Sequence, residues 1–215
     1  MTAPDVHGSD STGGTTRRNL LTAFSKGAVS AVATPLTPCW AKPLAGLHIR
    51  YDDQPAILLR SKEGRSLSRD RYESAEIAFM GIEAGYFSHL RYLRETLHQA
   101  GSVAKLALCA YLLDVGFSDA WNAAHIRQDI DKSLAYANAT GFGHDCPDMG
   151  RLAIILSPFW KWGYPRLHGD PPMDDGGFTS ADVRHLVRAL LDRVHDLTGH
   201  PRPKGCRRDP REARA

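Results

Sequence analysis

The sequence lacks the motifs by which many enzyme families are recognised. It contains no Gly-x-Ser-x-Gly, no Gly-x-x-x-x-Gly-Lys-Ser/Thr, no Gly-x-Gly-x-x-Gly and no His-Glu-x-x-His. These absences exclude the usual signatures of α/β-hydrolases, P-loop nucleotidases, dinucleotide-binding domains and zinc peptidases. They favour a protein that is not an enzyme, and they leave its activity to be argued from less specific features.

Cysteines and long apolar runs are also scarce. The four cysteines (Cys39, Cys109, Cys146 and Cys206) are scattered, and no two of them form a Cys-x-x-Cys pair. This spacing excludes a zinc ribbon and a thioredoxin-type site, while an even number permits disulfides in an exported protein. No segment approaches the roughly 20 uninterrupted apolar residues that a bilayer span needs, so we expect no stable transmembrane span. A composition of 42% hydrophobic and 24% charged residues excludes a wholly disordered chain.

The net charge of +3 is concentrated at the chain ends. Residues 201–215 hold six Lys and Arg against two Asp and Glu. We expect a disordered leader over 1–39, a helical domain over 40–200 and a disordered basic tail over 201–215. A basic tail can contact nucleic acid, but no aromatic residue lies among these arginines to stack on bases. Nucleic-acid binding by a cytoplasmic protein therefore stays an alternative that the sequence does not favour.

A pair of arginines opens an unusual segment near the N-terminus. Arg17 and Arg18 precede a weakly apolar stretch, which ends in the small residues Ala31 and Ala33. In this order of features, residues 16–33 resemble a twin-arginine signal peptide. The resemblance implies export of an already folded protein to the periplasm, with cleavage after Ala33. A linker in a cytoplasmic protein is the alternative.

Apolar residues recur with helical spacing through the body of the chain. A stripe that includes Phe79, Ile82, Leu93 and Leu97 predicts one long helix that ends at Gly101. Four further helices are predicted over 102–115, 119–139, 147–157 and 180–198. The first of these four is apolar nearly all round, which indicates a central element.

Short connections between these helices predict a mainly α fold, a single antiparallel bundle of about five helices. A Thr179–Asp182 capping box and Gly199 are expected to bound the last helix. Alternation of Leu47, Ile49 and Tyr51 with polar residues predicts a small N-terminal β-hairpin within 46–60.

An aromatic segment follows the fourth helix. It contains Phe159, Trp160, Trp162 and Tyr164 beside basic residues. Large aromatic side chains with adjacent positive charge are typical of a binding surface, so we expect a protein partner there. The alternative is that one tryptophan fills the end of the bundle.

A polar loop before the fourth helix offers the best metal ligands in the sequence. His144, Cys146 and Asp148 are of residue types that bind divalent metals. The alternative is a loop in which Asp145 caps the helix and Pro147 occupies its first position. No other cofactor is predicted.

A helix-turn-helix around Gly116 is not favoured. Its second helix would place Asn122 and His125 where apolar packing residues are needed.

The sequence therefore predicts, first, a non-enzymatic helical binding protein of unknown partner. A metal-binding protein or metal-dependent enzyme centred on the loop from His144 to Cys146 is the second hypothesis. The oligomeric state is not indicated.

Overall fold

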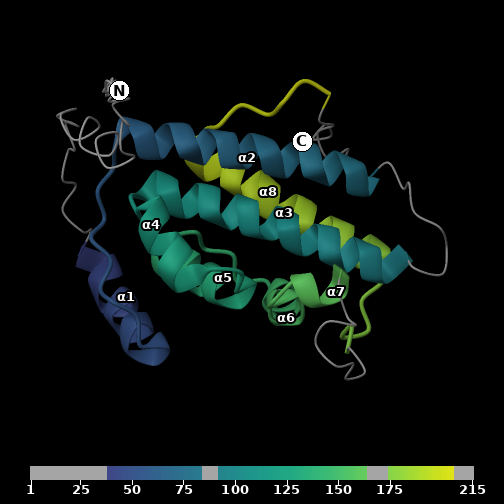
Figure 1. Ribbon diagram of the computed structural model, residues 1–215, viewed down its shortest axis with the longest axis horizontal. Helices are drawn as coiled ribbons and strands as arrows, with labels where there is room; N and C mark the ends of the chain where they lie inside the picture. Colours follow the sequence, from purple (N-terminus) through teal and green to yellow (C-terminus); the bar gives the residue numbers. More distant parts are fainter. Residues whose placement is uncertain (1–37, 84–91, 164–173, 206–215) are drawn as a thin grey trace, which may run out of the picture. The chain divides into compact units, whose positions relative to one another are not determined.

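Helices dominate the structure, as the apolar spacing predicts. The computed structural model describes residues 38–83, 92–163 and 174–205, which all belong to one compact unit, Ala31–Ala215. This described part contains α-helices and one π-helix but no β-strand, so the mainly α fold is confirmed (Figure 1). The elements are α1 (Pro38–Tyr51), α2 (Lys62–Glu83), α3 (Tyr92–Val115), α4 (Asp119–Trp121), the π-helix η1 (Asn122–Ile126), α5 (Ile130–Ala139), α6 (Pro147–Leu156), α7 (Trp160–Gly163) and α8 (Ser180–Thr198).

Several expectations fall outside these residues. The features assigned to the twin-arginine segment (Arg17, Arg18, Ala31 and Ala33), Tyr164 of the aromatic segment and residues 206–215 of the basic tail are not among the described residues. Within the described ranges, none of the helices has both the length and the hydropathy that crossing a membrane requires.

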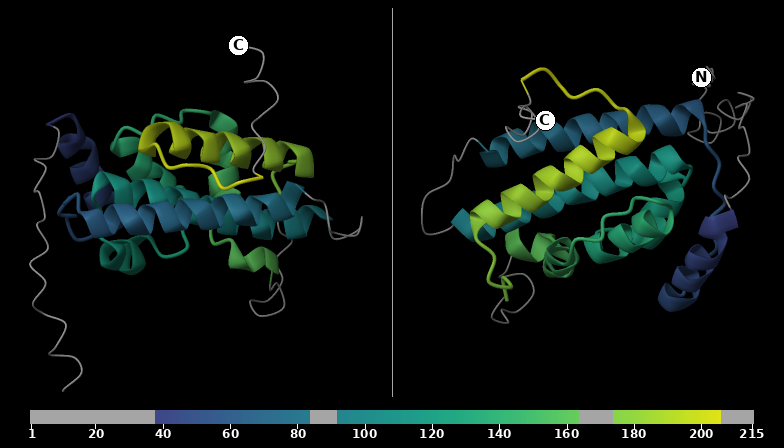
Figure 2. Two further views of the ribbon diagram at one scale, coloured as in Figure 1. Left: turned by 90° about the horizontal axis from the view of Figure 1, so that it is seen from above. Right: turned by 180° about the vertical axis from the view of Figure 1, so that it is seen from behind.

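Helices α2, α3 and α8 lie side by side, with α5 and α6 on the other side of α3 (Figures 1 and 2). Arg65, near the start of α2, donates hydrogen bonds to Asp114 at the end of α3 and to the carbonyl of Thr198 at the end of α8. Helix α2 is therefore antiparallel to both, and α3 and α8 run in the same direction. The expected antiparallel order fails for this last pair because the chain between them is long and itself helical, so no short connection reverses it.

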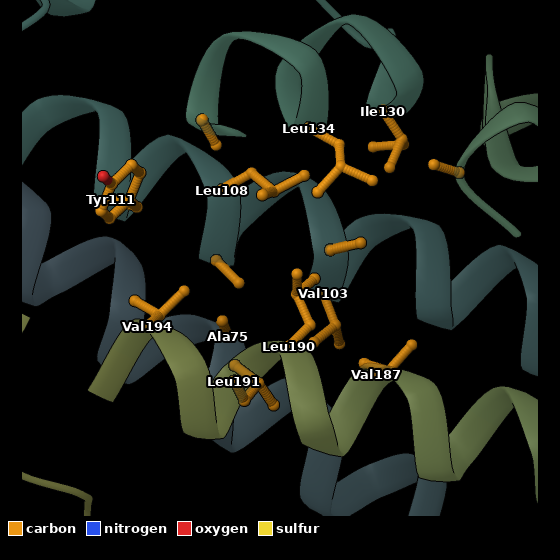
Figure 3. Packing of buried hydrophobic residues seen from close by; sticks show 14 of the residues in the cluster. Ala75, Val103, Leu108, Tyr111, Ile130, Leu134, Val187, Leu190, Leu191 and Val194 are labelled. Atoms are coloured by element: carbon orange, nitrogen blue, oxygen red, sulfur yellow. The ribbon is translucent and has the colours of Figure 1, made fainter. Parts of the chain in front are cut away.

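The core forms where α3 meets its neighbours on both sides. Figure 3 shows apolar side chains of α2, α3, α5 and α8 meeting in one cluster. Val103 and Leu108 of α3 are fully buried, as are Ile130 of α5 and Leu190 of α8. Full burial of one such side chain contributes about 1.5–3 kcal/mol. The central place predicted for residues 102–115 is thus confirmed.

The predicted helix end at Gly101 is wrong, because α3 continues through this residue from Tyr92 to Val115. A Cβ atom at Gly101 would lie 2.1 Å from the Cβ of Phe159. The glycine allows Phe159 to pack directly on the backbone of α3. Glycine in a helical pattern here marks a close approach, not a stop.

The predicted β-hairpin is also wrong, because residues 38–51 form α1. Leu44, Leu47 and Tyr51 are spaced by three and four residues, and Leu44 is buried. Ile49, which belongs to the alternating pattern, is 84% exposed. The segment forms a helix and not a strand because the helical spacing places the apolar side chains of Leu44, Leu47 and Tyr51 on one face.

The two ends of α8 form as predicted. The Thr179 hydroxyl accepts a hydrogen bond from the backbone N–H of Asp182, and the Asp182 carboxylate accepts one from the backbone N–H of Thr179. Gly199 closes the helix in the left-handed conformation. Helix α8 is therefore held at both ends by local bonds that its own sequence encodes.

Candidate functional site

The aromatic segment turns mostly inward. Trp162 is 4% exposed and its indole N–H donates to the carbonyl of Ile155 at 3.0 Å. Phe159 is half-buried against the core beside Gly101. Trp160 lines a cavity, which is described below. Two of the predicted binding residues thus fill the end of the bundle, and one lies at a hollow in the surface.

The predicted metal-binding residues do not gather around one point. Cys146 occupies the N-cap position of α6, where Asp145 was expected, and Asp148 forms an exposed ion pair with Arg151 at 3.1 Å. Burial lowers the pKa of His144, whose Nε2 atom has no hydrogen-bond partner in the described part of the chain. Across residues 38–83, 92–163 and 174–205, no group of three or more His, Cys, Asp and Glu side chains could hold a metal ion.

A cavity of about 870 Å³ lies between α3, η1 and the start of α5. Ser157, Pro158 and Trp160 line it from the segment that follows α6, and Arg71 lines it from α2. Leu106, Cys109 and Leu112 of α3 contribute an apolar wall. The volume falls within the roughly 300–1,000 Å³ of sites that bind small molecules.

The backbone beside this cavity is irregular. The Ser118 hydroxyl accepts a hydrogen bond from the N–H of Trp121 and starts α4, but after one turn the helix widens into η1. Arg127 then has a φ of 55°, and the Asp129 side chain caps the new helix α5. The single helix predicted over 119–139 is therefore wrong at its centre. Single π-turns are rare and frequently lie at functional sites.

Asn122, the first residue of the π-helix, lines the cavity and has a side chain without a hydrogen-bond partner among the described residues. The residue is only 6% exposed, and both its Oδ1 and its Nδ2 are shielded from solvent with no hydrogen-bond partner in the described structure. Oε1 of Gln128, in the same wall, is likewise buried without a partner. Each buried polar group that is left without a hydrogen bond lowers the free energy of unfolding by about 1–3 kcal/mol. The packing of the protein alone does not account for these polar atoms.

Asp53, in the loop after α1, organises the charges at one side of the cavity. Its Oδ1 accepts a hydrogen bond from Nζ of Lys132 at 2.7 Å and lies 3.2 Å from Nδ1 of His125. Its Oδ2 accepts one from the hydroxyl of Tyr136 at 2.7 Å. Burial raises the pKa of Asp53, but the hydrogen bonds from Lys132 and Tyr136 outweigh it and lower that pKa. The carboxylate therefore stays charged and holds two cavity residues in place.

His48 extends this network into α1. The N–H of Ala56 donates to its Nε2 at 3.3 Å, so the proton of the neutral ring lies on Nδ1 and faces the Tyr136 hydroxyl at 3.1 Å. The Tyr136 hydroxyl in turn donates to Asp53. Helix α1 is thus joined to the side chains of the cavity by a continuous chain of hydrogen bonds.

The cavity wall carries more positive than negative charge. The charged lining residues are Arg71, Lys105, Arg127 and Lys132 on the positive side and Asp119 and Asp129 on the negative side. Asp53 neutralises Lys132, and Arg71 lies 3.8 Å from Asp119 in an exposed pair. Lys105 forms no ion pair with any described residue and lies over the ring of Phe159 at 6.0 Å. The excess positive charge of the lining therefore belongs to Lys105 on α3 and to Arg127, which follows η1.

Cys109 does not supply a reactive thiolate to this cavity. Burial raises the pKa of its thiol to about 11, although the positive charges of Arg71 and Lys105 act in the opposite direction. At neutral pH the sulfur is therefore protonated and weakly nucleophilic. Its role in the wall is that of a small apolar side chain.

A second group of residues has the composition of a hydrolytic triad without its geometry. The Ser68 hydroxyl donates to the carbonyl of Ala110 and lies 2.6 Å from Nε2 of His200. Asp114 lies 3.9 Å from that same Nε2, whereas in a triad the acid holds the other ring nitrogen. Ser68 and His200 are also buried, so this group joins α2, α3 and the end of α8.

Comparison with protein-family models, with curated proteins and with solved structures finds no match for this chain. The function is therefore argued from the cavity itself. Two cavity residues could be recognised from the sequence, because Asn122 and His125 occupy positions where a packed helix needs apolar residues. Lys105 and Gln128 could not be recognised, because neither residue type is unusual on a helix or in a loop.

Proposed function

We propose that this chain is a non-enzymatic binding protein that holds a small molecule in the cavity beside the π-helix. The observation that carries the proposal is Asn122, a residue of the cavity lining that is 6% exposed and whose carboxamide atoms have no hydrogen-bond partner in the described part of the chain. Buried polar groups in proteins are nearly always paired. A ligand that pairs with this group accounts for its retention.

The chemical character of the wall supports the same proposal. Leu106, Leu112 and Ile126 supply apolar surface, and a few polar groups converge on it. This combination is typical of small-molecule sites. A protein-binding role for the aromatic segment has less support, because Trp162 fills the bundle end and Phe159 packs on α3.

The proposal is tested by filling the cavity. A library of small metabolites is screened for compounds that raise the melting temperature of the full chain, and each hit is repeated on Ala123→Trp. Ala123 is exposed and lines the cavity, so a tryptophan there blocks it. Ala124 is exposed but is not part of the lining, and Ala124→Trp is the matched control.

We expect hits to stabilise the wild type and the Ala124→Trp control and to leave Ala123→Trp unchanged. Hits that stabilise all three proteins equally bind elsewhere and contradict the proposal. A broad library without any hit contradicts it as well.

We further propose that the chain is exported by the twin-arginine route, on the sequence of residues 16–33 alone. Changing Arg17→Lys together with Arg18→Lys keeps the charge and removes the paired guanidinium groups. We expect the changed protein to stay in the cytoplasm, while the wild type reaches the periplasm with a new N-terminus at Thr34. Fractionation with mass spectrometry of the N-terminus measures both, and equal distribution of the two proteins rejects export by this route.

A further inference from the structure

We propose that α1 is a pH-sensitive latch, which protonation of His48 releases from the rest of the bundle. Three features of the molecule support this proposal: the hydrogen bonds around the His48 ring, the charged groups that face it, and the shallow packing of α1. The latch concerns how α1 is attached to the bundle, and it holds whether or not the cavity binds a ligand.

Both ring nitrogens of His48 contact groups outside α1. Nε2 accepts a hydrogen bond from the backbone N–H of Ala56 at 3.3 Å, and Nδ1 lies 3.1 Å from the hydroxyl of Tyr136 on α5. A backbone N–H group can only donate, so the bond from Ala56 requires an unprotonated Nε2. A second proton on the ring would place two donors face to face and remove this bond.

The charged groups that face His48 come from three parts of the chain. Burial of the ring has the largest influence and lowers the pKa of His48. Asp53, in the loop after α1, raises that pKa, whereas His125 of η1 and Lys132 of α5 lower it. Two aromatic rings, one from α4 and one from α5, also lie within 6 Å of the imidazole. With these influences combined, the pKa of His48 lies below its ordinary value of 6.5 while α1 is docked.

The direction of the pH effect follows from this difference. Release of α1 returns the His48 ring to water, where its pKa is about 6.5. Below that pH the released form binds the proton more readily than the docked form, so acid shifts the equilibrium toward release. A single group binds a single proton, so the equilibrium constant for release rises by about tenfold at most for each pH unit.

The packing of α1 is shallow enough for the helix to open locally. Leu44 is the one α1 residue in the described part of the chain that is buried, while Trp40, Leu47 and Tyr51 are partly buried. Among the described helices, α1 packs mainly against α5. Elements with few buried apolar contacts open without unfolding of the whole domain. The loss of one hydrogen bond at His48 can therefore change how often α1 opens.

The neighbouring carboxylate does not titrate together with His48. Asp53 keeps its hydrogen bonds from Lys132 and Tyr136, which hold its pKa below the ordinary range although burial acts in the opposite direction. It therefore stays charged under mildly acidic conditions, and the loop that contains it stays bound to α5. Protonation of His48 is thus the change that weakens the attachment of α1.

The proposal is tested by hydrogen–deuterium exchange of the full chain, measured by mass spectrometry between about pH 7.5 and about pH 5. The exchange of α1 amides, corrected for the pH dependence of exchange in an unstructured peptide, gives the opening constant of α1. His48→Gln keeps a side-chain oxygen that can accept the bond from Ala56, but it does not titrate. His185→Gln is the matched control, because His185 is an exposed histidine of α8.

We expect the opening constant of α1 to rise several-fold on acidification in the wild type and in His185→Gln, and to stay constant in His48→Gln. Acid effects on other groups are common to the three proteins and do not enter this comparison. An NMR titration of the His48 imidazole in the wild type, assigned by its absence from the spectrum of His48→Gln, gives an independent readout. It should yield a pKa below 6.5.

Three results would overturn the proposal. One is an opening constant of α1 that does not change with pH in the wild type. Another is an equal acid response in His48→Gln and the wild type, which would assign the response to a different group, such as His125. The third is a pKa of His48 at or above 6.5 in the folded chain. If His48→Gln opens α1 at every pH, the NMR titration of the wild type decides between the outcomes.

Discussion

On the side of α3 that packs against α2 and α8, the most deeply buried carboxylate is fully paired, whereas on the side that borders the cavity two amide side chains have buried atoms without a partner among the described residues. On the first side, Glu76 is buried and accepts two hydrogen bonds from the Arg188 guanidinium, at 2.5 and 2.9 Å, and one from the Tyr72 hydroxyl. On the second side, Asn122 and Gln128 contain buried polar atoms without a hydrogen-bond partner among residues 38–83, 92–163 and 174–205.

The difference separates groups that stabilise the fold from groups that are available for binding. Burial raises the pKa of Glu76, but the hydrogen bonds from Arg188 and Tyr72 outweigh it and lower that pKa. The Glu76 carboxylate is therefore charged and fully hydrogen-bonded. The polar groups beside the cavity are not paired in this way, and the backbone there is irregular at η1 and at Arg127. Four substitutions or conditions can break this comparison.

The largest effect is expected for Arg188→Met. It removes the partner of a buried carboxylate, and breaking one member of such a pair costs about 3–5 kcal/mol. Urea denaturation of wild type and variant measures the loss. The double change Glu76→Gln with Arg188→Met also removes the carboxylate of Glu76, and Asp192 keeps its ion pair with Arg202, so the double variant should lose less than the single change. A single variant within 1 kcal/mol of the wild type, roughly the value of an exposed pair, would show that the buried pair is not structural.

The next largest effect is expected for Gly101→Ala, at the point where α3 meets Phe159. The added Cβ would lie 2.1 Å from the Cβ of Phe159, so we expect a loss of about 1–3 kcal/mol of unfolding free energy. The control is Gly81→Ala in α2, where no atom lies within 4 Å of the new Cβ. That change should be neutral or stabilising, because alanine favours a helix. Equal effects at the two glycines would contradict the close packing at Gly101.

The same glycine shows how far sequence reasoning reaches. Helical spacing identified most helices, and local rules gave the ends of α8, because these depend on neighbouring residues. Gly101 was interpreted as a helix end because its partner, Phe159, is distant in the chain. A glycine that stops a helix and one that admits a side chain look identical until the tertiary contact is known.

The cavity could not be predicted from the sequence for a related reason. It needs α2, α3, η1, α5 and the segment after α6 in one place, and no local pattern encodes their meeting. The interruption between η1 and α5 was missed since apolar positions continue through it, among them Ile126 and Ile130. Aromatic content drew attention to residues 159–164, yet only Trp160 of the described part lines the cavity.

A moderate loss of stability is expected on acidification, because His200 is buried on the side of α3 that packs against α2 and α8. Burial lowers the pKa of His200 below its ordinary value of 6.5. Below pH 6.5 the unfolded chain therefore binds the proton more readily than the folded one, and stability falls as the pH decreases toward the folded-state pKa. Melting temperature against pH should show this decline, reduced in His200→Asn. Parallel curves for the two proteins would exclude His200 as a source of the decline.

The smallest effect is expected for Asn122→Leu, and it has the opposite sign. The change removes two buried polar atoms that have no partner in the described structure, so we expect a gain of about 1 kcal/mol in unfolding free energy together with loss of ligand binding. Asn138→Leu is the matched control. The Asn138 carboxamide pairs with the backbone N–H and carbonyl of His144, so its loss should destabilise the fold. If both changes destabilise the chain, the Asn122 side chain serves the fold, and the contrast between the two sides of α3 fails at its central residue.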